Sequence, residues 1–369
     1  MTQRAVCLID LDALVHNLGE IRRVVGDDVR ICAVVKSNAY GHGGALVAET
    51  LARAGVDHLA VATFEEARTL RRAGIEVPIL LLSGLALADV REALDLDLTA
   101  AIWDENSLRK LVDAVPAGRP LRVHLKVDTG MRRLGSDDLP SLLAVASHDS
   151  IEVEGLFSHL ACADDDRADS VSLQKTRFDE AIAIAREAGC IPRIRHLANS
   201  AGLLSSHHTH YDMVRPGLAL YGCSPLGSAP LPISLRPVME FRTRILHLKT
   251  VPAGVGIGYG WSFRTQRETR LAILAVGYGQ GYPRALSNRG CVDLGGGRAP
   301  IVGNVSMDHI AVDVTDLGEV ALDTPVTLWG GATGPNVMEL AESAGTIGYE
   351  LLTRIPEEMP RRINGGKKT

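Results

Sequence analysis

The feature that most constrains the fold is a regular alternation of short apolar segments with amphipathic segments from the chain start to Arg215. We expect a first helix with Asp12 as its N-cap and Gly26 as its stop, and the clearest later helix spans 170–187, before Gly189. Eight such units predict a (β/α)8 barrel, and a doubly wound open sheet is the structural alternative. The eight strand candidates are 31–35, 58–62, 78–82, 98–102, 122–126, 153–157, 193–197 and 213–215.

The pattern changes at a proline-rich stretch, 230–237, which is a candidate linker. Beyond it strands dominate, at 243–251, 271–276 and 302–314, and one late helix is expected at about 336–344. This order predicts a mostly antiparallel β domain after the barrel. We divide the chain into a barrel over 1–235 and a β domain over 236–369, with the first few residues as a candidate extra strand of the second domain.

Composition and charge exclude several classes of protein. The 369 residues are 46% hydrophobic and 22% charged, which is ordinary for a soluble globular protein, and the net charge of -5 provides no electrostatic footprint for nucleic acid. The six cysteines form no Cys-x-x-Cys pair, which indicates free thiols in a reducing compartment. We find no signal-peptide core and no apolar run long enough to span a membrane, so a cytoplasmic protein without a membrane partner is expected.

A lysine ends the first of the eight apolar segments, and it is the strongest candidate for chemistry. Lys36 follows Ile31-Cys32-Ala33-Val34-Val35 and precedes a glycine-rich turn that carries Tyr40 and His42. Such a lysine can form a Schiff base when its surroundings lower its pKa, although a lone strand-end lysine more often merely ends a strand. The eleven residues 33–43, Ala-Val-Val-Lys-Ser-Asn-Ala-Tyr-Gly-His-Gly, resemble the pyridoxal-phosphate lysine motif of alanine racemases, and this favours the functional interpretation.

The resemblance to alanine racemases continues from Ala33 to about Arg354, with the motifs in the family's order. It implies a pyridoxal 5'-phosphate barrel followed by a β domain, in agreement with the order of elements above. It also implies a homodimer that interconverts L-alanine and D-alanine, in bacteria chiefly to supply D-alanine for peptidoglycan. The motifs after the lysine are 126–135, 157–161, 196–201, 215–222, 256–261, 277–284 and 303–308.

The motif at 126–135 holds three basic residues and one acid, and a structural ion-pair cluster is the alternative interpretation. In the family, the arginine before Leu-Gly contacts the substrate carboxylate and the cofactor's phenolic oxygen, so the resemblance implies this role for Arg133 rather than Arg132. Bidentate recognition of a carboxylate suits arginine better than lysine. The family's lysine at the start of the motif is commonly carbamylated, and Lys126 holds that place.

The last two loops of the barrel are candidates for a phosphate site, because barrels often bind phosphate there. Ser200 and the amides of Gly217 and Leu218 are the groups we select. The resemblance implies the same residues and adds further cofactor contacts. These are Tyr40, Tyr349 and Asn199.

Arg215 follows the last barrel strand, and the resemblance implies that it faces the pyridine nitrogen of the cofactor. Many pyridoxal-phosphate enzymes place an acid there, but an arginine cannot accept the nitrogen's proton. The ring is then a poorer electron sink, which favours simple reprotonation over transamination or decarboxylation. His159 ends the sixth strand; it is either an ordinary core histidine or, by the resemblance, a residue that hydrogen-bonds to Arg215.

Tyr259 lies in the glycine-flanked stretch 256–261, where a turn residue is the ordinary interpretation. The resemblance makes it the second catalytic base, entering the barrel of the other subunit. Racemisation needs a proton removed from one face and returned to the other, and Lys36 with Tyr259 forms such a pair. The same domain supplies Tyr278 at the entrance and Met307, whose amide would contact the substrate carboxylate, followed by Asp308. Gly279-Gln280 replaces the family's Ala-Asp.

Other functions remain as alternatives. A related racemase for serine or lysine is the first, a pyridoxal-phosphate decarboxylase the second, and a non-catalytic carrier of the cofactor the third. Arg215 argues against the decarboxylase, which uses a glutamate there, and the β domain with Tyr259 argues against the carrier. The stretch 277–284 lacks the spacing of a dinucleotide loop. His207-His208-Thr209-His210 has no accompanying acid or thiol cluster, so we expect no metal site.

Overall fold

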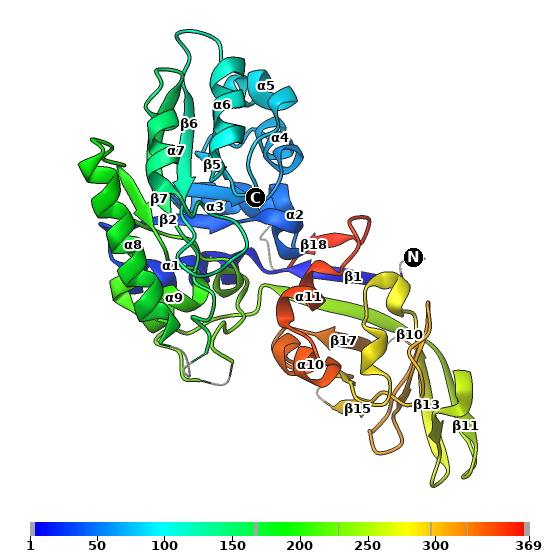
Figure 1. The fold of residues 1–369 in the computed structure, drawn as a ribbon. Helices are drawn as coiled ribbons and strands as arrows, with labels where there is room; N and C mark the ends of the chain where they lie inside the picture. Colours follow the sequence, from blue (N-terminus) through cyan, green and yellow to red (C-terminus); the bar gives the residue numbers. More distant parts are fainter. Residues whose placement is uncertain (1–3, 166–168, 228, 296, 323, 365–369) are drawn as a thin grey trace.

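The computed structural model describes residues 4–165, 169–227, 229–295, 297–322 and 324–364. Figure 1 shows two parts, a barrel with helices around it and a smaller β domain joined to it along one side. The barrel contains eight parallel strands in the order β8-β7-β6-β5-β4-β3-β2-β9. Their bounds are β2 Arg30–Val34, β3 His58–Val61, β4 Ile79–Leu81, β5 Leu98–Ile102, β6 Leu121–Lys126, β7 Ile151–Phe157, β8 Ile194–His196 and β9 Met213–Val214.

The sheet closes through the short strand β9. It pairs in parallel with β2, with Met213 opposite Arg30. On its other side the amide of Arg215 donates to the carbonyl of Ala198 over 3.0 Å, just after β8. The predicted barrel is therefore confirmed, and a doubly wound open sheet is wrong. The strands occupy the predicted segments because each is an apolar run that can be buried on both faces.

Helices cover the outside of the barrel, and one expectation about them is wrong. Helix α1 begins at Leu11 rather than after Asp12, because Asp10 is the N-cap and its Oδ1 accepts from the amide of Ala13 over 2.8 Å. Asp12 instead lies in the first turn. The helical bounds are α1 Leu11–Val25, α2 Lys36–Tyr40, α3 Gly44–Arg53, α4 Phe64–Arg72, η1 Leu87–Asp89, α5 Val90–Asp95, α6 Glu105–Ala114, α7 Leu139–Ala146, α8 Ser170–Glu187, α9 Ser200–Ser205, η2 His207–Thr209 and η3 Leu218–Tyr221.

The second part is a mostly antiparallel sheet that includes the start of the chain. Strand β1, Ala5–Ile9, pairs antiparallel with β10, Met239–Val251, and parallel with β18, Arg361–Ile363. Its other elements are β11 Gly256–Ile257, η4 Tyr259–Trp261, β12 Phe263–Arg264, β13 Thr269–Leu274, η5 Tyr278–Gln280, η6 Arg284–Leu286, β14 Cys291–Asp293, β15 Arg298–Pro300, β16 Ile310–Asp313, β17 Pro325–Trp329, α10 Val337–Ala344 and α11 Gly348–Thr353.

The strand expected over 302–314 forms only at its end, in β16. Before it, Gly303 has a φ of +83°, and a Cβ there would lie 2.8 Å from the carbonyl oxygen of Ile257. Ser306 and His309 then close a turn, in which the amide of Ser306 donates to the carbonyl of His309 over 3.0 Å. Val302 and Val305 are buried in this turn, whereas Met307 is exposed. Apolar residues in the sequence alone do not distinguish such a turn from a strand.

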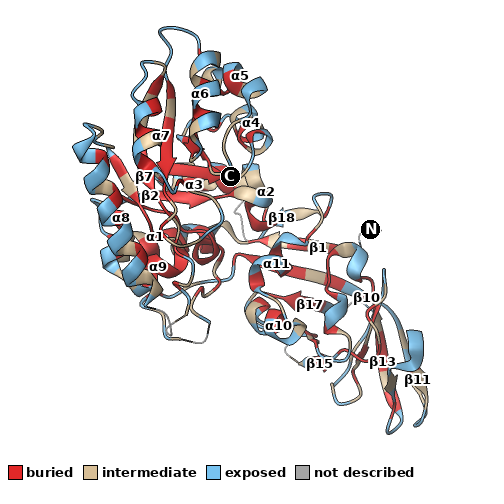
Figure 2. Cartoon of the chain, viewed as in Figure 1, coloured by how far each residue is buried: buried red, intermediate tan, exposed pale blue. Residues whose placement is uncertain are grey.

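Figure 2 shows that the barrel strands and the central strands of the β domain are the buried parts of the molecule. One cluster of buried apolar side chains continues from the barrel into the β domain, and includes Leu14, Tyr221, Phe241 and Trp329. Shared packing of this kind holds the two parts in contact. Among the described helices, none combines the length and the apolar character that crossing a bilayer would require.

Asn17 on helix α1 fastens the stretch that leads from the barrel to the β domain. Its side chain is fully buried. Its Nδ2 donates to the carbonyls of Leu220 and Arg236 over 3.0 and 2.8 Å, and its Oδ1 accepts from the amide of Arg236 over 2.8 Å. One amide thus satisfies three backbone groups that would otherwise be buried without partners.

We predict that Asn17→Leu lowers the free energy of unfolding by about 2–4 kcal/mol, because these backbone groups lose their partners. Urea unfolding followed by circular dichroism measures this. Val15→Ala on the exposed face of the same helix is the matched control, with an expected change below about 0.5 kcal/mol. Equal urea midpoints for wild type and Asn17→Leu would contradict the prediction.

Candidate active site

Lys36 lies at the carboxyl end of β2 and begins a turn of unusual hand. The four residues after it, Ser37 to Tyr40, have φ values between 51° and 54°, so the chain makes a left-handed turn directly after the lysine. Each such residue costs about 1–2 kcal/mol when it is not glycine. A locally unfavourable backbone of this kind persists only where the surrounding structure holds it.

Contacts from three directions hold the turn. The amide of Ser37 donates to Glu66 Oε1 over 2.5 Å, and Asn38 Oδ1 accepts from the amide of Gly44 over 2.6 Å. From the β domain, Arg361 Nε donates to the carbonyl of Gly41 over 2.7 Å. Gly41 is required there, since a Cβ would lie 2.2 Å from the carbonyl oxygen of Leu352. The backbone at Lys36 therefore depends on barrel and β domain together.

Four basic side chains of the barrel act on one another at these strand ends. Burial lowers the pKa of Lys36, and the positive charge of Arg133 lowers it further. Burial also lowers the pKa of Lys126 to about 8, with Arg215 and Arg133 adding to the effect. Arg132 forms an ion pair with Asp137, whereas Arg133 makes no ion pair within the described chain. Arg133, the predicted arginine, is thus the one free to meet an anion.

Arg215 is buried and held by neutral acceptors. Its Nη1 lies 2.7 Å from His196 Nδ1, and its Nη2 donates to the carbonyls of Ser158 and Leu197 over 2.7 and 3.0 Å. The predicted neighbour His159 places its Nδ1 3.3 Å from the same Nη2. Burial lowers the pKa of Arg215 to about 10, and among the described residues no carboxylate forms an ion pair with it.

The residues selected for phosphate converge beside the left-handed turn. Ser200 Oγ accepts from the amide of Gly217 over 2.8 Å. A Cβ on Gly217 would lie 2.5 Å from the hydroxyl of Tyr40, so only glycine lets the two meet. The rings of Tyr40 and Tyr349 are 5.9 Å apart. Of the other two predicted residues, Asn199 caps α9 by accepting from the amide of Gly202, and Leu218 begins η3.

The remaining predicted residues form a second group on the β domain. Tyr259 lies in η4 between β11 and β12, with 76% of its surface exposed. Asn304 Nδ2 donates to the carbonyl of Tyr259 over 2.7 Å, which links this turn to the one that carries Met307. The amide of Tyr278 donates to Ser306 O, and the amide of Gly279 to Met307 O. Asp308 Oδ1 lies 3.3 Å from Gln280 Nε2.

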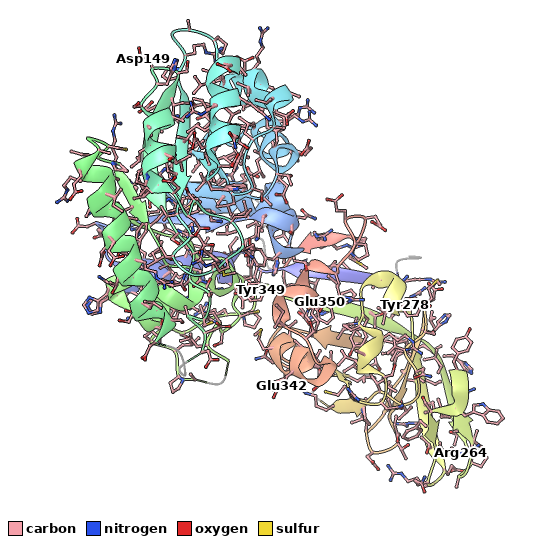
Figure 3. All side chains as sticks on the ribbon, in the orientation of Figure 1. Asp149, Arg264, Tyr278, Glu342, Tyr349 and Glu350 are labelled. Atoms are coloured by element: carbon pink, nitrogen blue, oxygen red, sulfur yellow. The ribbon has the colours of Figure 1, made fainter. Side chains whose placement is uncertain are left out.

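These two groups lie apart in the single chain. In Figure 1 the β11 hairpin lies at the end of the β domain that is remote from the barrel, while α2 with Lys36 lies in the barrel. Figure 3 shows Tyr349 on the side of the β domain next to the barrel and Arg264, at the end of the Tyr259 hairpin, at the far end. Within one chain, therefore, the structure brings Tyr349 but not Tyr259 to the barrel residues.

Sequence reasoning missed three polar residues inside the barrel, His124, Glu154 and the ring of His196. His124 precedes Lys126 by two residues on β6, so alternation places both on one side of the strand, and this signal was available. Glu154 gave no such signal, because β7 has an irregular register there.

Gln280, at the departure from the family motif, accepts from the amide of Gly277 over 2.9 Å and so closes the local turn.

The histidine cluster at the barrel's edge does not gather ligands. The rings of His207 and His208 are 3.8 Å apart, and His210 Nε2 lies 2.9 Å from the carbonyl of Leu203. Within the described part of the chain, no three His, Cys, Asp or Glu residues are grouped as a metal ion would need.

Fold and site together define a barrel enzyme with a strand-end lysine among cations and an accompanying β domain. The model of the alanine racemase N-terminal domain matches residues 9–225, and that of the C-terminal domain matches residues 238–363. The chain belongs to the alanine racemase family, whose members interconvert L-alanine and D-alanine. The resemblance inferred from the motifs is thereby confirmed.

Individual relatives agree along the whole chain. The alanine racemase of Desulforamulus reducens is 41% identical over 360 residues, which cover 96% of this chain and 97% of the relative. The crystal structure of the alanine racemase from Streptomyces lavendulae superposes with a TM-score of 0.91 at 36% identity, covering 100% and 99% of the two chains. The Bacillus anthracis alanine racemase with bound L-Ala-P has a TM-score of 0.92 at 35% identity, covering 100% and 97%.

From the lowered pKa of Lys126 we predict how the free energy of unfolding depends on pH. Its pKa is about 8 in the folded chain and 10.5 as the ordinary value. Between about pH 8 and 10.5 the unfolded chain binds more protons, so with a free amine the free energy of unfolding rises with pH in this window. Lys126→Met should flatten this rise, as measured by urea unfolding in buffer free of carbon dioxide.

The matched control is Lys249→Met at an exposed lysine of β10, which should keep the wild-type dependence on pH. A Lys126→Met protein whose stability changes with pH as steeply as that of the wild type would show that Lys126 is not the titrating group.

Proposed function

We propose that this chain is a cytoplasmic, homodimeric alanine racemase that uses pyridoxal 5'-phosphate and two acid–base residues, Lys36 and Tyr259. The observation that carries the proposal is that the two candidate acid–base residues lie on different domains of the chain. The barrel holds a strand-end lysine of lowered pKa among cations, while a free tyrosine stands exposed on the β domain. Incubating the purified protein and the cofactor with L-alanine, and following D-alanine, tests the activity directly.

The residues present fit the cofactor. A phosphate group needs hydrogen-bond donors and a backbone that it can approach closely. Gly217 has no side chain, so its backbone stays accessible beside the Tyr40 hydroxyl. The amides of Gly217 and Leu218, with the hydroxyls of Ser200, Tyr40 and Tyr349, are the groups that would hold it. Asn199 positions Ser200 by capping the same helix. When bound, the cofactor's ring takes up the electron pair left as the α-carbon loses its proton.

Lys36 would hold the cofactor aldehyde, because its lowered pKa makes the free amine accessible. Arg215 would face the ring nitrogen. Its Nη1 and Nη2 are engaged within the barrel, while its Nε makes no hydrogen bond within the described chain, so Nε–H is the donor available to a ligand. Since arginine keeps its own proton and can only donate, Arg215 would leave the nitrogen of a bound ring unprotonated, which would limit the electron density that the ring accepts.

Arg133 would bind the substrate carboxylate, and the amide of Met307 would bind it from the second group. Lys126 would carry a carbamate, which turns one of four crowded cations into an anion facing Arg133. Its pKa of about 8 supports this, because the neutral amine is the form that reacts with carbon dioxide. Tyr278 and Asp308 line the entrance beside Met307, to which the Tyr278 turn is hydrogen-bonded.

Two bases must stand on opposite faces of one α-carbon, within reach of its proton. Lys36 supplies one face. Tyr259 is remote from Lys36 in its own chain, so we propose that it reaches the barrel of a partner subunit and that each site is shared. His159 would contact this tyrosine: its Nδ1 accepts from Arg215, which leaves its Nε2–H to meet the phenol oxygen.

The alternatives are less well supported. The relatives described above are alanine racemases, and none of their names points to serine, lysine or a decarboxylase. A non-catalytic carrier would have no use for an exposed tyrosine opposite the lysine.

The cytoplasmic location is supported by the described cysteines, all six of which are free thiols. We place the domain boundary near residue 235, between the two family matches.

The shared site predicts complementation. Lys36→Ala and Tyr259→Phe should each abolish racemisation, and mixing them should restore it. A mixed dimer has one intact and one doubly damaged site, so random exchange of subunits should recover roughly a quarter of the wild-type rate. Tyr259→Phe alone should still exchange the α-proton of one alanine enantiomer with solvent deuterium, through Lys36.

The control mixes Lys36→Ala with Arg215→Ala. Both changes lie in the barrel, so no mixed dimer holds an intact site and no recovery is expected. If exchange of subunits is verified and the Lys36→Ala and Tyr259→Phe mixture stays inactive, the two bases do not act across subunits.

A further inference from the structure

A line of hydrogen bonds crosses the interior of the barrel behind Arg215. Arg215 Nη1 lies 2.7 Å from His196 Nδ1, and His196 Nε2 lies 2.8 Å from His124 Nδ1. His124 Nε2 then lies 3.3 Å from Glu154 Oε2. Thr99 Oγ1 donates to the same carboxylate oxygen over 3.4 Å. The line therefore runs from Arg215, just after β9, through β8 and β6 to the carboxylate of Glu154 on β7.

The direction of every bond in this line is determined by its first member. A guanidinium only donates, so His196 Nδ1 must accept. A neutral His196 then carries its proton on Nε2 and donates to His124 Nδ1, and His124 in turn carries its proton on Nε2. Both rings are fully buried, and burial lowers the pKa of each, which keeps them neutral. Only Glu154 can complete such a line, because its last member must accept.

The backbone of β7 is irregular at Glu154, and this irregularity brings the carboxylate to His124. The pairing of β6 with β7 shifts between Val123 and His124, which marks a bulge at Glu154. Bulges redirect a side chain that alternation would send elsewhere. The next residue is Gly155, where a Cβ would lie 2.7 Å from the ring of His124. The hydrogen bond from His124 holds the pKa of Glu154 at about 2, so this carboxyl is ionised.

We propose that His124 and Glu154 are positioning residues for Arg215, and that they lock His196 into the tautomer that accepts from the guanidinium. The two imidazoles point their lone pairs toward Arg215 and their N–H groups toward Glu154. Their aligned dipoles stabilise a buried cation that has no ion pair in the part of the chain that the structure describes. Arg215 therefore keeps its charge and its orientation, and its Nε–H stays directed at the ligand. The catalytic consequence rests on the proposed function, whereas the tautomers do not.

Neutron diffraction from the cofactor-loaded protein tests the tautomers directly, because it locates the protons. We expect both His196 and His124 to carry a proton on Nε2 and none on Nδ1. A proton on Nδ1 of either ring would overturn the proposal, whether or not the protein racemises alanine. Failure of the wild type to racemise alanine would instead overturn the proposed function and leave this result standing.

Variants of Glu154 test the consequence. Glu154→Leu removes the acceptor, and we expect kcat to fall about tenfold, equal to about 1.4 kcal/mol, with KM for alanine changed less than about twofold. Glu154→Gln keeps an oxygen that accepts from His124, and its kcat should stay within about threefold of the wild type. A merely structural role would not separate these two variants in kcat while sparing KM.

The matched control is Glu152→Leu, which removes a carboxylate from the same strand but only loosens a surface pair with Arg193, 3.7 Å away. It should leave kcat unchanged. Equal losses in Glu154→Leu and Glu154→Gln, or none in either, would refute the tautomer lock. Should Glu154→Leu fail to fold, the neutron result and the Glu154→Gln rate still decide.

Discussion

A guanidinium buried without a carboxylate partner among the described residues is the constraint on which the rest of this site depends. Burying a charge is costly unless other groups compensate for its lost hydration. Arg215 obtains this compensation from backbone carbonyls and from the imidazoles of His196 and His159. Because these acceptors are neutral, the positive charge is not cancelled. Burial lowers the pKa of Lys126, and this charge lowers it further. Lys36 and Arg133 crowd the same strand ends, and in our proposal an anion, a substrate or a carbamate, balances their charge.

The barrel fold brings these basic residues together in space although they lie far apart in the sequence. Parallel strands place their carboxyl ends at one edge, so Lys36 after β2, Lys126 at the end of β6 and Arg215 after β9 meet there. The β domain then acts on this edge in two ways. Within the chain, Arg361 holds the left-handed turn and Tyr349 lies beside Tyr40 at the proposed phosphate site. Between chains, by our proposal, Tyr259 completes the site of the partner.

The left-handed turn after Lys36 shows how local preference yields to tertiary contacts. Asn38 is a residue type that tolerates such a conformation, but Ser37, Ala39 and Tyr40 are not, and each of these would cost about 1–2 kcal/mol. The turn is held by Glu66, by Gly44 and by Arg361, which lie far apart along the chain. It directs Tyr40 at Gly217, so the strain is coupled to the shape of the proposed phosphate site.

The sequence by itself determined the alternation of elements, the two-part order and the motifs. Each of these follows from residues that are adjacent in sequence: the spacing of apolar residues, the positions of glycines, or the motif around Lys36. It misplaced the N-cap of α1 by two residues, because Asp10 and Asp12 are equally suited to that position until the backbone is seen. Only the tertiary structure decided that β1 joins the second sheet, that Gly217 faces Tyr40, and that Tyr259 lies away from its own Lys36. Only it revealed the bulge that turns Glu154 toward His124. These are contacts between residues distant in sequence, and their free energy depends on packing that no local pattern encodes.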